Sequence, residues 1–301
     1  MGNLYLLLLG LTVEFCMIFS KLKALQITNK FNSISILKIP LIRRGMSELL
    51  HSANNGGELE SINEERRQTV VSNLLAVKER MIESCIRAER NPEDIKLVAV
   101  SKTKPSSDIL ALYNEGHRHF GENYFQELVE KAKALPTDIK WHFIGHLQSS
   151  KAMKIIRDVR NLDLLETLDS SKLAAKLNSA CESIQREPLK VLIQVDTSGE
   201  DTKSGVAVES ELLDLVKFVK EECPFLQFTG LMTIGAPGDI LCFDRLVAAR
   251  KIVADSLGAE ELSLQLSMGM SGDFEEAVAK GATSVRVGST IFGDRIYNKK
   301  S

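Results

Sequence analysis

The chain has few of the residues that would indicate a disulfide scaffold, a local metal site or a strong charged surface. It contains only five cysteines in 301 residues. They form no C-x-x-C pair and no other metal-ligand spacing, so we interpret them as reduced thiols packed in the core. The 38 basic and 40 acidic residues give a formal charge of -2, so neither nucleic acid nor an anionic membrane is an expected partner. Recognition must therefore come from a local site.

What is present is an ordinary globular composition, with 44% hydrophobic and 26% charged residues. This length and composition allow one large barrel or two modest domains with a sizeable buried core.

The first 45 residues differ in composition from everything after them. An apolar run from Leu4 to Phe19 precedes a basic stretch, and Glu14 is the only acidic residue in this region. Such a composition fits a mitochondrial or plastid transit peptide, whereas the apolar run also fits a signal h-region or a short membrane anchor. A dispensable extension is a third interpretation, because Met46 begins a sequence that resembles an ordinary N-terminus. We expect a leader over residues 1–45 and a flexible linker over residues 46–58.

The rest of the chain alternates short apolar runs with helical patterns. A long amphipathic helix is predicted from Leu59 to Arg90, where Asn91-Pro92 stops the pattern. The eight apolar runs that follow are Lys96–Ser101, Arg118–Gly121, Trp141–Gly145, Leu162–Thr167, Lys190–Asp196, Phe228–Ile234, Leu262–Met268 and Ser284–Phe292. The clearest helical segments between them are Ser107–Glu115, Ser171–Ser183, Glu209–Glu222, Phe243–Leu257 and Phe274–Lys280.

This alternation predicts an α/β protein whose residues 59–297 form a single (β/α)8 TIM barrel with an extra N-terminal helix. An open doubly wound sheet is the main alternative. It usually has fewer strands, and no Gly-x-Gly-x-x-Gly follows the first run.

Functional groups of such a barrel lie at the carboxyl ends of its strands. Lys102 follows the first run, where partial desolvation can make its amine a nucleophile able to form a Schiff base. A lysine after a strand is more often a solvated loop residue, so Lys102 alone is a weak signal.

The loops after the seventh and eighth runs contain small and hydroxyl residues. Ser267 and Gly269 belong to the first of these loops, and Gly288 and Ser289 to the second. Small residues let backbone N–H groups approach an anion, and these two loops are the usual phosphate site of the fold. The alternative is that the glycines serve only turns and helix caps.

Arg286 lies within the eighth run, where its side chain can point into the barrel. Because it is permanently protonated, it needs an acceptor, and a neutral ring nitrogen would suit it. The alternative partner is an inward acidic residue such as Glu122 or Glu166.

Other strand ends offer residues that could complete a pocket. Asn123 follows the second run, while Lys151 and Lys203 lie near later strand ends and could act as relay amines. His142 and His146 share a strand face, but no third ligand is spaced for a metal, so no metal site is expected.

Several motifs together resemble those of the pyridoxal phosphate homeostasis protein family. They are Ala99–Lys104, Phe120–Tyr124, Trp141–Gln148, Lys203–Gly205, Gly230–Met232, Ser267–Ser271 and Val285–Gly288. The resemblance covers roughly residues 60–297, and one departure is Ser150, where the family usually has asparagine.

The resemblance implies a fold like the N-terminal barrel domain of alanine racemase, with pyridoxal 5′-phosphate (PLP) as the cofactor. It implies that Lys102 forms a Schiff base with PLP and that Arg286 faces the pyridine nitrogen. The phosphate would be held by four residues, and Asn123 would be a further pocket residue. These four are Ser267, Gly269, Gly288 and Ser289. An arginine at the ring nitrogen leaves it unprotonated, which disfavours transaminase-type chemistry.

The resemblance therefore favours a non-catalytic PLP carrier in vitamin B6 homeostasis. Such a protein would buffer PLP in the cytoplasm and deliver it to PLP-dependent apoenzymes, as a monomer. Alanine racemase draws a second base from a separate C-terminal domain, and only nine residues follow Phe292 here. A PLP-dependent racemase or lyase, with Lys102 as one base and Lys151 or His146 as the other, is the alternative. A barrel that binds another phosphorylated metabolite without a covalent bond is a third.

Overall fold

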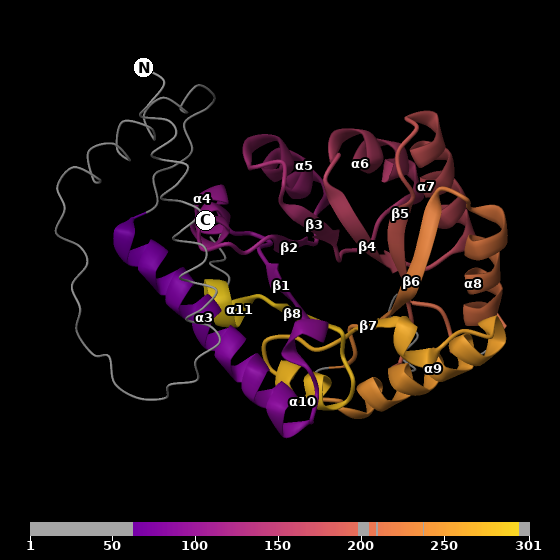
Figure 1. Ribbon diagram of the computed structural model, residues 1–301. Coiled ribbons are helices and arrows are strands. Elements are labelled where there is room, and N and C mark those ends of the chain that lie inside the picture. Colours follow the sequence, from indigo (N-terminus) through magenta and orange to yellow (C-terminus); the bar gives the residue numbers. More distant parts are fainter. Residues whose placement is uncertain (1–62, 198–204, 209, 237, 295–301) are drawn as a thin grey trace, which may run out of the picture. The chain divides into compact units, whose positions relative to one another are not determined.

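The computed structural model describes residues 63–197, 205–208, 210–236 and 238–294 (Figure 1). Its strands are β1 Lys96–Val100, β2 His119–Glu122, β3 Lys140–Phe143, β4 Leu162–Leu168, β5 Leu189–Gln194, β6 Leu226–Met232, β7 Gln265–Ser267 and β8 Ser284–Val287. Its helices are α3 Glu64–Arg87, α4 Ser106–Asn114, α5 Phe125–Ala134, α6 Ala152–Asp158, α7 Ser171–Ser183, α8 Ser210–Glu222, α9 Leu241–Leu257, α10 Phe274–Ala279 and α11 Ser289–Phe292. The predicted leader at 1–45, the linker at 46–58 and the barrel ends at 59–62 and 295–297 lie outside these residues.

The eight strands form one closed parallel barrel in the order of the sequence. Closure comes from the pairing of β1 with β8, in which Lys96 lies opposite Ser284 and Ala99 opposite Val287. The predicted TIM barrel is confirmed, and the open-sheet alternative is wrong. Parallel strands put all their carboxyl ends at one mouth of the barrel and all their amino ends at the other.

Helix α3 precedes β1 and corresponds to the long helix predicted from Leu59. The Asn63 side chain caps its first turn by accepting a hydrogen bond from the Glu65 N–H at 2.9 Å. Its buried face repeats at helical spacing and contacts α4, α10 and α11. The residues of that face are Val70, Leu74, Val77, Met81, Ser84 and Cys85. Arg80 and Glu275 of α10 form an ion pair at 2.8 Å that fixes the helix against its neighbour.

The eighth apolar run is not one strand, as the sequence had suggested for Ser284–Phe292. Strand β8 ends at Val287, and residues Ser289–Phe292 form the short helix α11. Gly288 makes this break, with φ −116° and ψ −77°, and its N–H donates to the Ser271 hydroxyl at 3.1 Å. The chain after β8 therefore leaves the strand direction and packs as α11 against α3.

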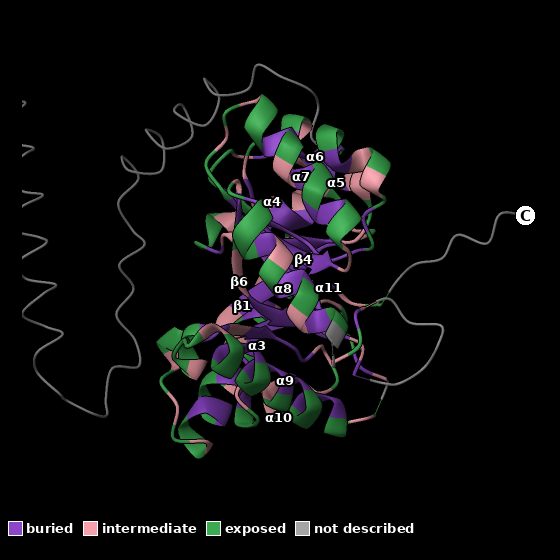
Figure 2. Ribbon diagram, turned by 90° about the vertical axis from the view of Figure 1, so that its right-hand side faces the viewer, coloured by how far each residue is buried: buried purple, intermediate pink, exposed green. Residues whose placement is uncertain are grey.

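Burial follows the layers of the barrel. Figure 2 shows strands in the colour of buried residues, while the helices around them present exposed outer faces. Cys85, Cys181, Cys223 and Cys242 are buried free thiols, as predicted, and burial raises the pKa of each. Cys16 lies outside the described residues. Among the helices described, none is both long and apolar enough to cross a membrane.

Candidate functional site

A cavity of about 330 Å³ lies at the carboxyl-end mouth of the barrel. It brings together four of the predicted site residues, namely Lys102, Arg286, Gly288 and Ser289. The rest of its lining comes from Val100, Lys104, Ile144, Met270, Ser271, Gly272, Gly293 and Asp294. The cavity therefore combines an amine from the first strand end with a guanidinium and hydroxyl groups from the seventh and eighth.

The loop that carries Lys102 is held on both sides of that residue. The backbone of Thr103 is in the left-handed region, with φ 63°, and its N–H donates to the Glu127 carboxylate at 2.6 Å. On the other side, the Lys131 ammonium donates to the Ser101 carbonyl at 2.8 Å. A left-handed non-glycine residue costs free energy and persists only where its surroundings enforce it. The Glu127 contact supplies such enforcement, so Lys102 has a fixed place at the barrel mouth.

Beneath this loop lies a buried carboxylate, Glu122, at the end of β2. It accepts hydrogen bonds from the Ser101 hydroxyl at 2.6 Å and the Lys131 ammonium at 2.7 Å, both at Oε1. Burial raises its pKa to about 6, although Lys131 opposes that shift. Within the described part of the chain, Oε2 has no hydrogen-bond partner. Glu122 thus joins β2, α5 and the Lys102 loop through one buried ion pair.

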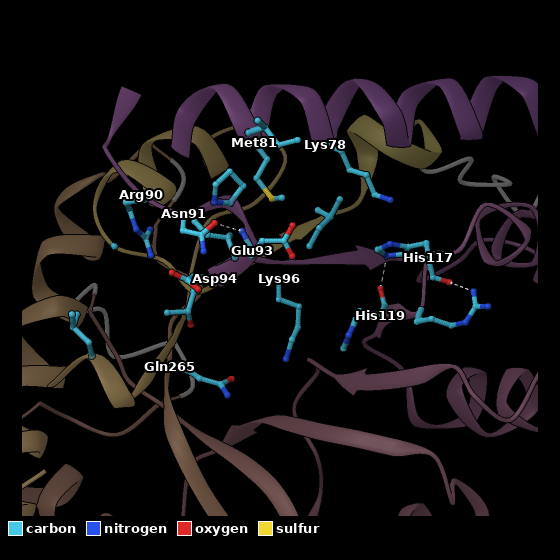
Figure 3. A pocket seen from close by; sticks show the side chains of 18 of the residues that line it. Lys78, Met81, Arg90, Asn91, Glu93, Asp94, Lys96, His117, His119 and Gln265 are labelled. Carbon is cyan, nitrogen blue, oxygen red and sulfur yellow. Dashed lines mark hydrogen bonds between the residues drawn. The ribbon is translucent and has the colours of Figure 1, made fainter. Parts of the chain in front are cut away.

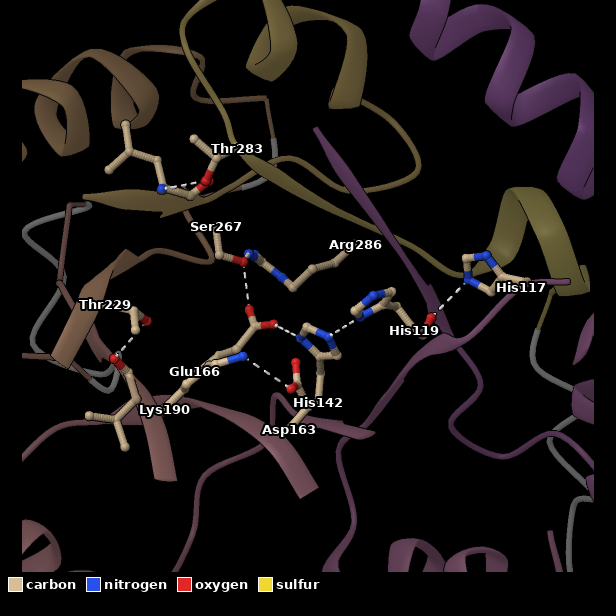
Figure 4. A network of polar contacts seen from close by, with 12 residues as sticks. His117, His119, His142, Asp163, Glu166, Lys190, Thr229, Ser267, Thr283 and Arg286 are labelled. Atoms are coloured by element: carbon tan, nitrogen blue, oxygen red, sulfur yellow. Dashed lines mark hydrogen bonds and ion pairs between the residues drawn. The ribbon is translucent and has the colours of Figure 1, made fainter. Parts of the chain in front are cut away.

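Arg286 is almost fully buried and points into the barrel (Figure 4). Its Nη1 donates to the Ser267 hydroxyl at 2.6 Å and its Nη2 to the Thr233 carbonyl at 2.7 Å. The Ser267 hydroxyl in turn donates to Glu166 Oε2 at 2.5 Å. The acidic partner considered from the sequence is therefore present as Glu166, one hydroxyl away from the guanidinium.

The charges of this buried network influence each other. Burial lowers the pKa of Arg286, while the nearby Glu166 opposes that change. Burial by itself would raise the pKa of Glu166, but a hydrogen bond from His142 and the charge of Arg286 lower it overall. Glu166 therefore stays ionised and stabilises the guanidinium that faces the cavity.

Ser271 lines the cavity, although no role was predicted for it from its sequence motif. Its hydroxyl accepts hydrogen bonds from the N–H groups of Gly288 at 3.1 Å and Thr290 at 3.4 Å. It therefore lies where the loops after β7 and β8 meet. The sequence places Ser271 in the Ser267–Ser271 motif. Only the loop conformation shows that the hydroxyls of Ser271 and Ser267 point in different directions.

Three predicted site residues do not line this cavity. The hydroxyl of Ser267 is fully buried and is occupied by Arg286 and Glu166. Gly269 has φ +89°, and a Cβ atom there would lie 2.4 Å from the Cβ of Ala277, so glycine is needed for packing. The Asn123 Oδ1 atom is buried and has no hydrogen-bond partner in the described residues. The cofactor roles of these three residues remain predictions.

The candidate second bases also lie away from the cavity. The His146 side chain is 59% exposed and pairs with Asp169 at 3.3 Å. Lys151 has its ammonium 5.8 Å from the centre of the Phe125 ring. Neither residue contributes to the cavity lining that contains Lys102, so these two candidate bases do not lie beside that amine. Lys203 lies outside the described residues.

Comparison with known proteins places this geometry in a family. The model of the alanine racemase N-terminal domain family matches residues 72–296. The mouse pyridoxal phosphate homeostasis protein is 48% identical over 241 residues, which is 75% of this chain and 87% of that protein. The Escherichia coli protein of the same name is 40% identical over 237 residues, covering 77% and 99% of the two chains.

Solved structures agree in fold. A protein of unknown function from Bifidobacterium adolescentis is 31% identical with a TM-score of 0.70, covering 77% of this chain and 98% of that one. PipY of Synechococcus elongatus, solved with PLP bound, is 33% identical with a TM-score of 0.58, covering 72% and 100%. Alanine racemase of Clostridium difficile, at 15% identity, has a TM-score of 0.58 over 79% of this chain and 59% of that one, a likeness of fold alone. Because the family model spans most of the chain and the relatives are this similar, the chain belongs to the pyridoxal phosphate homeostasis protein family, within the alanine racemase N-terminal domain family.

Proposed function

We propose that this protein binds PLP in the carboxyl-end cavity and serves PLP homeostasis by holding and releasing the cofactor. The observation that carries the proposal is that Lys102, Arg286, Gly288 and Ser289 line one cavity of about 330 Å³. That volume is within the range of small-molecule sites. The names of the curated relatives and the PLP-bound PipY structure support the same cofactor.

The donors around the cavity suit the parts of PLP. The cofactor supplies an aldehyde that condenses reversibly with an amine, and Lys102 is the amine of the clamped loop. Ser271 and Ser289 offer hydroxyl groups for the phosphate, and Gly288 offers close backbone approach. A Cβ atom at Gly288 would lie 3.3 Å from the Val100 carbonyl, so a side chain there would crowd the junction of β8 with β1.

Arg286 determines how such a cofactor would behave. It has only donors, so it can hydrogen-bond to a neutral ring nitrogen but cannot accept a proton from a protonated one. Glu166 and Ser267 hold the guanidinium in its charged state and in one orientation. A neutral ring nitrogen withdraws electrons poorly, which favours retention of PLP over carbanion chemistry.

We propose further that the protein is a carrier without turnover. His146 and Lys151, the residues considered as a second base, lie outside the cavity lining. Its partners would then be PLP and PLP-dependent apoenzymes. We propose that the protein is a monomer and that it acts in the cytoplasm. We also propose a barrel over residues 59–297, preceded by a linker over residues 46–58. The leader over residues 1–45 would either target the protein to the mitochondrion or plastid or be dispensable.

The test uses the full chain. The absorbance spectrum is recorded with and without PLP, the sample is reduced with borohydride, and the labelled peptide is mapped by mass spectrometry. Lys104 lines the same cavity and donates to the Asp294 carbonyl at 2.7 Å, so Lys104→Ala is a matched control. We expect the label on Lys102 in the wild type and in Lys104→Ala. A label on Lys104, or none, contradicts the proposed site, and racemisation of an amino acid faster than with free PLP contradicts the carrier role.

A further inference from the structure

A second group of ligand-type side chains lies at the amino-end half of the barrel. His119 begins β2, His142 lies in β3 and Asp163 lies in β4, on three neighbouring strands. One ligand atom from each residue lies within 4.8 Å of the other two. Figure 4 shows the three side chains converging beside Glu166. None of the three lines the carboxyl-end cavity described above.

A bulge in β4 brings Asp163 into this group. Trp141 pairs with Leu162 while the next residue, His142, pairs with Leu164, so Asp163 is an extra residue in the strand. Such bulges redirect a side chain relative to the regular alternation of a strand. The irregular register thus accounts for a carboxylate in line with the two histidines.

The spacing of the two imidazoles suits a tetrahedral metal ion. The His119 Nδ1 and His142 Nε2 atoms face each other at 3.0 Å. Two nitrogen ligands at about 2.0–2.1 Å from a tetrahedral zinc ion lie roughly 3.3 Å apart. A displacement of about 0.3 Å would therefore replace the present contact between the rings with two metal bonds.

The other nitrogen of His142 has the partner expected of a metal ligand. Its Nδ1 atom contacts Glu166 Oε1 at 2.7 Å, and Glu166 is itself fixed by the Ser267 hydroxyl. A carboxylate that accepts the Nδ1 proton directs Nε2 toward a metal and makes it a better donor. His142 is thus oriented for coordination by groups that belong to the described network.

Nearby lysines narrow the choice of metal. Lys190 Nζ lies 3.4 Å from Asp163 Oδ1, and the charge of Lys96 also acts on Asp163. These cations oppose hard ions such as Mg²⁺ and Ca²⁺, which bind mainly through charge and oxygen ligands. Two imidazoles and one carboxylate favour Zn²⁺ and similar late first-row ions, whose bonds to nitrogen are strong. The contact with Lys190 uses Oδ1, and a carboxylate has a second oxygen that can also bind a cation.

Of the three residues, His119 reaches a cavity of about 1040 Å³ at the amino-end mouth. His119 lines it together with Lys96 and Gln265, which begin β1 and β7 (Figure 3). Three protein ligands leave one position of a tetrahedral ion for water or a small ligand. We infer that His119, His142 and Asp163 form a binding site for a Zn²⁺-type ion at the amino-end mouth, with its fourth position open to this cavity.

The experiment titrates the full-length protein, freed of metal with a chelator and without PLP, with Co²⁺. We expect one equivalent to bind with the visible absorption of tetrahedral cobalt and to be displaced by Zn²⁺. His119→Ala and Asp163→Asn should each weaken binding at least about 10-fold, and Glu166→Gln should weaken it about 10–100-fold through His142. His146→Ala is the matched control, because His146 is exposed and pairs with Asp169 instead.

Circular dichroism of each variant verifies that the barrel is folded. Absence of a stoichiometric Co²⁺ signal in the wild type, its full retention in both His119→Ala and Asp163→Asn, or its loss in folded His146→Ala would each overturn the inference. Because PLP is absent from the titration, failure of this metal site would leave the proposed PLP site untouched. Failure of PLP labelling at Lys102 would likewise leave the metal measurement valid.

Discussion

The two mouths of the barrel are built differently from the same eight strands. At the carboxyl end, residues from loops such as Lys102 and Ser271 surround a small cavity of about 330 Å³. At the amino end, residues that begin strands, such as His119, border a larger one of about 1040 Å³. Ion pairs and hydroxyl contacts hold the loops at the carboxyl end in place. At the amino end, the register between neighbouring strands positions the polar side chains. A barrel can therefore position polar groups both by its loops and by the register of its strands.

The two ends are also connected. A buried chain of polar contacts runs from Arg286 through Ser267, Glu166 and His142 to His119 (Figure 4). Its members contact one another at distances of 2.5–3.0 Å. The interior of this barrel is therefore a polar column on one side, while Leu164, Leu192 and Met232 form an apolar cluster of their own.

The largest effect is expected at the carboxyl end alone. Lys102→Ala removes the amine proposed to hold PLP covalently, so borohydride labelling should fall below detection. PLP should still bind through its phosphate, because the hydroxyl groups of Ser271 and Ser289 remain. Mass spectrometry after reduction measures the first effect, and equilibrium dialysis of PLP the second. Labelling at wild-type yield in this variant would show that another amine is used.

The next largest effect is expected from cutting the connection. Glu166→Leu leaves the buried charge of Arg286 without its carboxylate and His142 without its acceptor. Removal of one member of a buried ionic network costs about 3–5 kcal/mol of unfolding free energy. Urea denaturation at pH 7 measures this loss of unfolding free energy. The control is Asp169→Asn, which alters the pair with exposed His146 and should lower the unfolding free energy by less than about 1 kcal/mol. Equal losses of unfolding free energy in the two variants would contradict the greater importance of the buried network.

A pH effect is expected at the amino end. Burial lowers the pKa of His117 from 6.5 to about 4. The unfolded chain therefore binds this proton first, so the stability from neutral His117 is complete above pH 6.5 and is lost as the pH falls toward 4. The full loss corresponds to about 3 kcal/mol. His117→Gln, which can still reach the His119 carbonyl now bonded at 2.8 Å, should reduce the slope of unfolding free energy against pH over this range. Burial also lowers the pKa of His119 to about 3, which accounts for the slope that remains.

Urea denaturation at intervals from pH 4 to 7 provides that measurement. His146→Gln is the control, because this side chain is exposed and its replacement should leave the profile as in the wild type. An unchanged slope in His117→Gln would contradict the assignment of the pH effect to this buried imidazole.

The smallest effect concerns the phosphate. Ser271→Ala removes one hydroxyl from the carboxyl-end cavity, and a hydrogen bond to a charged group contributes about 1.5–3 kcal/mol. We expect about a 10-fold or greater rise in the Kd for PLP, measured by absorbance titration. Ser150→Ala, at an exposed serine, is the control. If Ser267→Ala lost more affinity for PLP than Ser271→Ala, the phosphate would be held by Ser267, as the sequence resemblance implies, and not by Ser271.

The sequence was sufficient to predict the barrel, because buried parallel strands appear as apolar runs and each of the eight runs overlaps one strand. It also predicted that Lys102, Arg286, Gly288 and Ser289 would meet, since strand ends share one mouth. It could not separate β8 from α11, because Ser289–Phe292 continues the apolar pattern and only the Gly288 backbone breaks the strand. Nor could it choose between Ser267 and Ser271, whose hydroxyls differ only in how the loop turns.

The group of His119, His142 and Asp163 at the amino end could not be predicted from the sequence for another reason. The sequence prediction considered His142 with His146, but β3 ends at Phe143 and His146 lies beyond the strand. The structure brings His142 instead to His119 on the neighbouring strand and, through a bulge, to Asp163. Register between strands, and irregularities in it, depend on the whole barrel and leave no local pattern.

The unbroken polar column between Arg286 and His119 has a thermodynamic consequence. If a ligand at one mouth changed the affinity for a second ligand at the other mouth through this column, the second ligand would change the affinity for the first by the same factor. A metal ion that strengthened PLP binding would thus itself be bound more strongly when PLP is present.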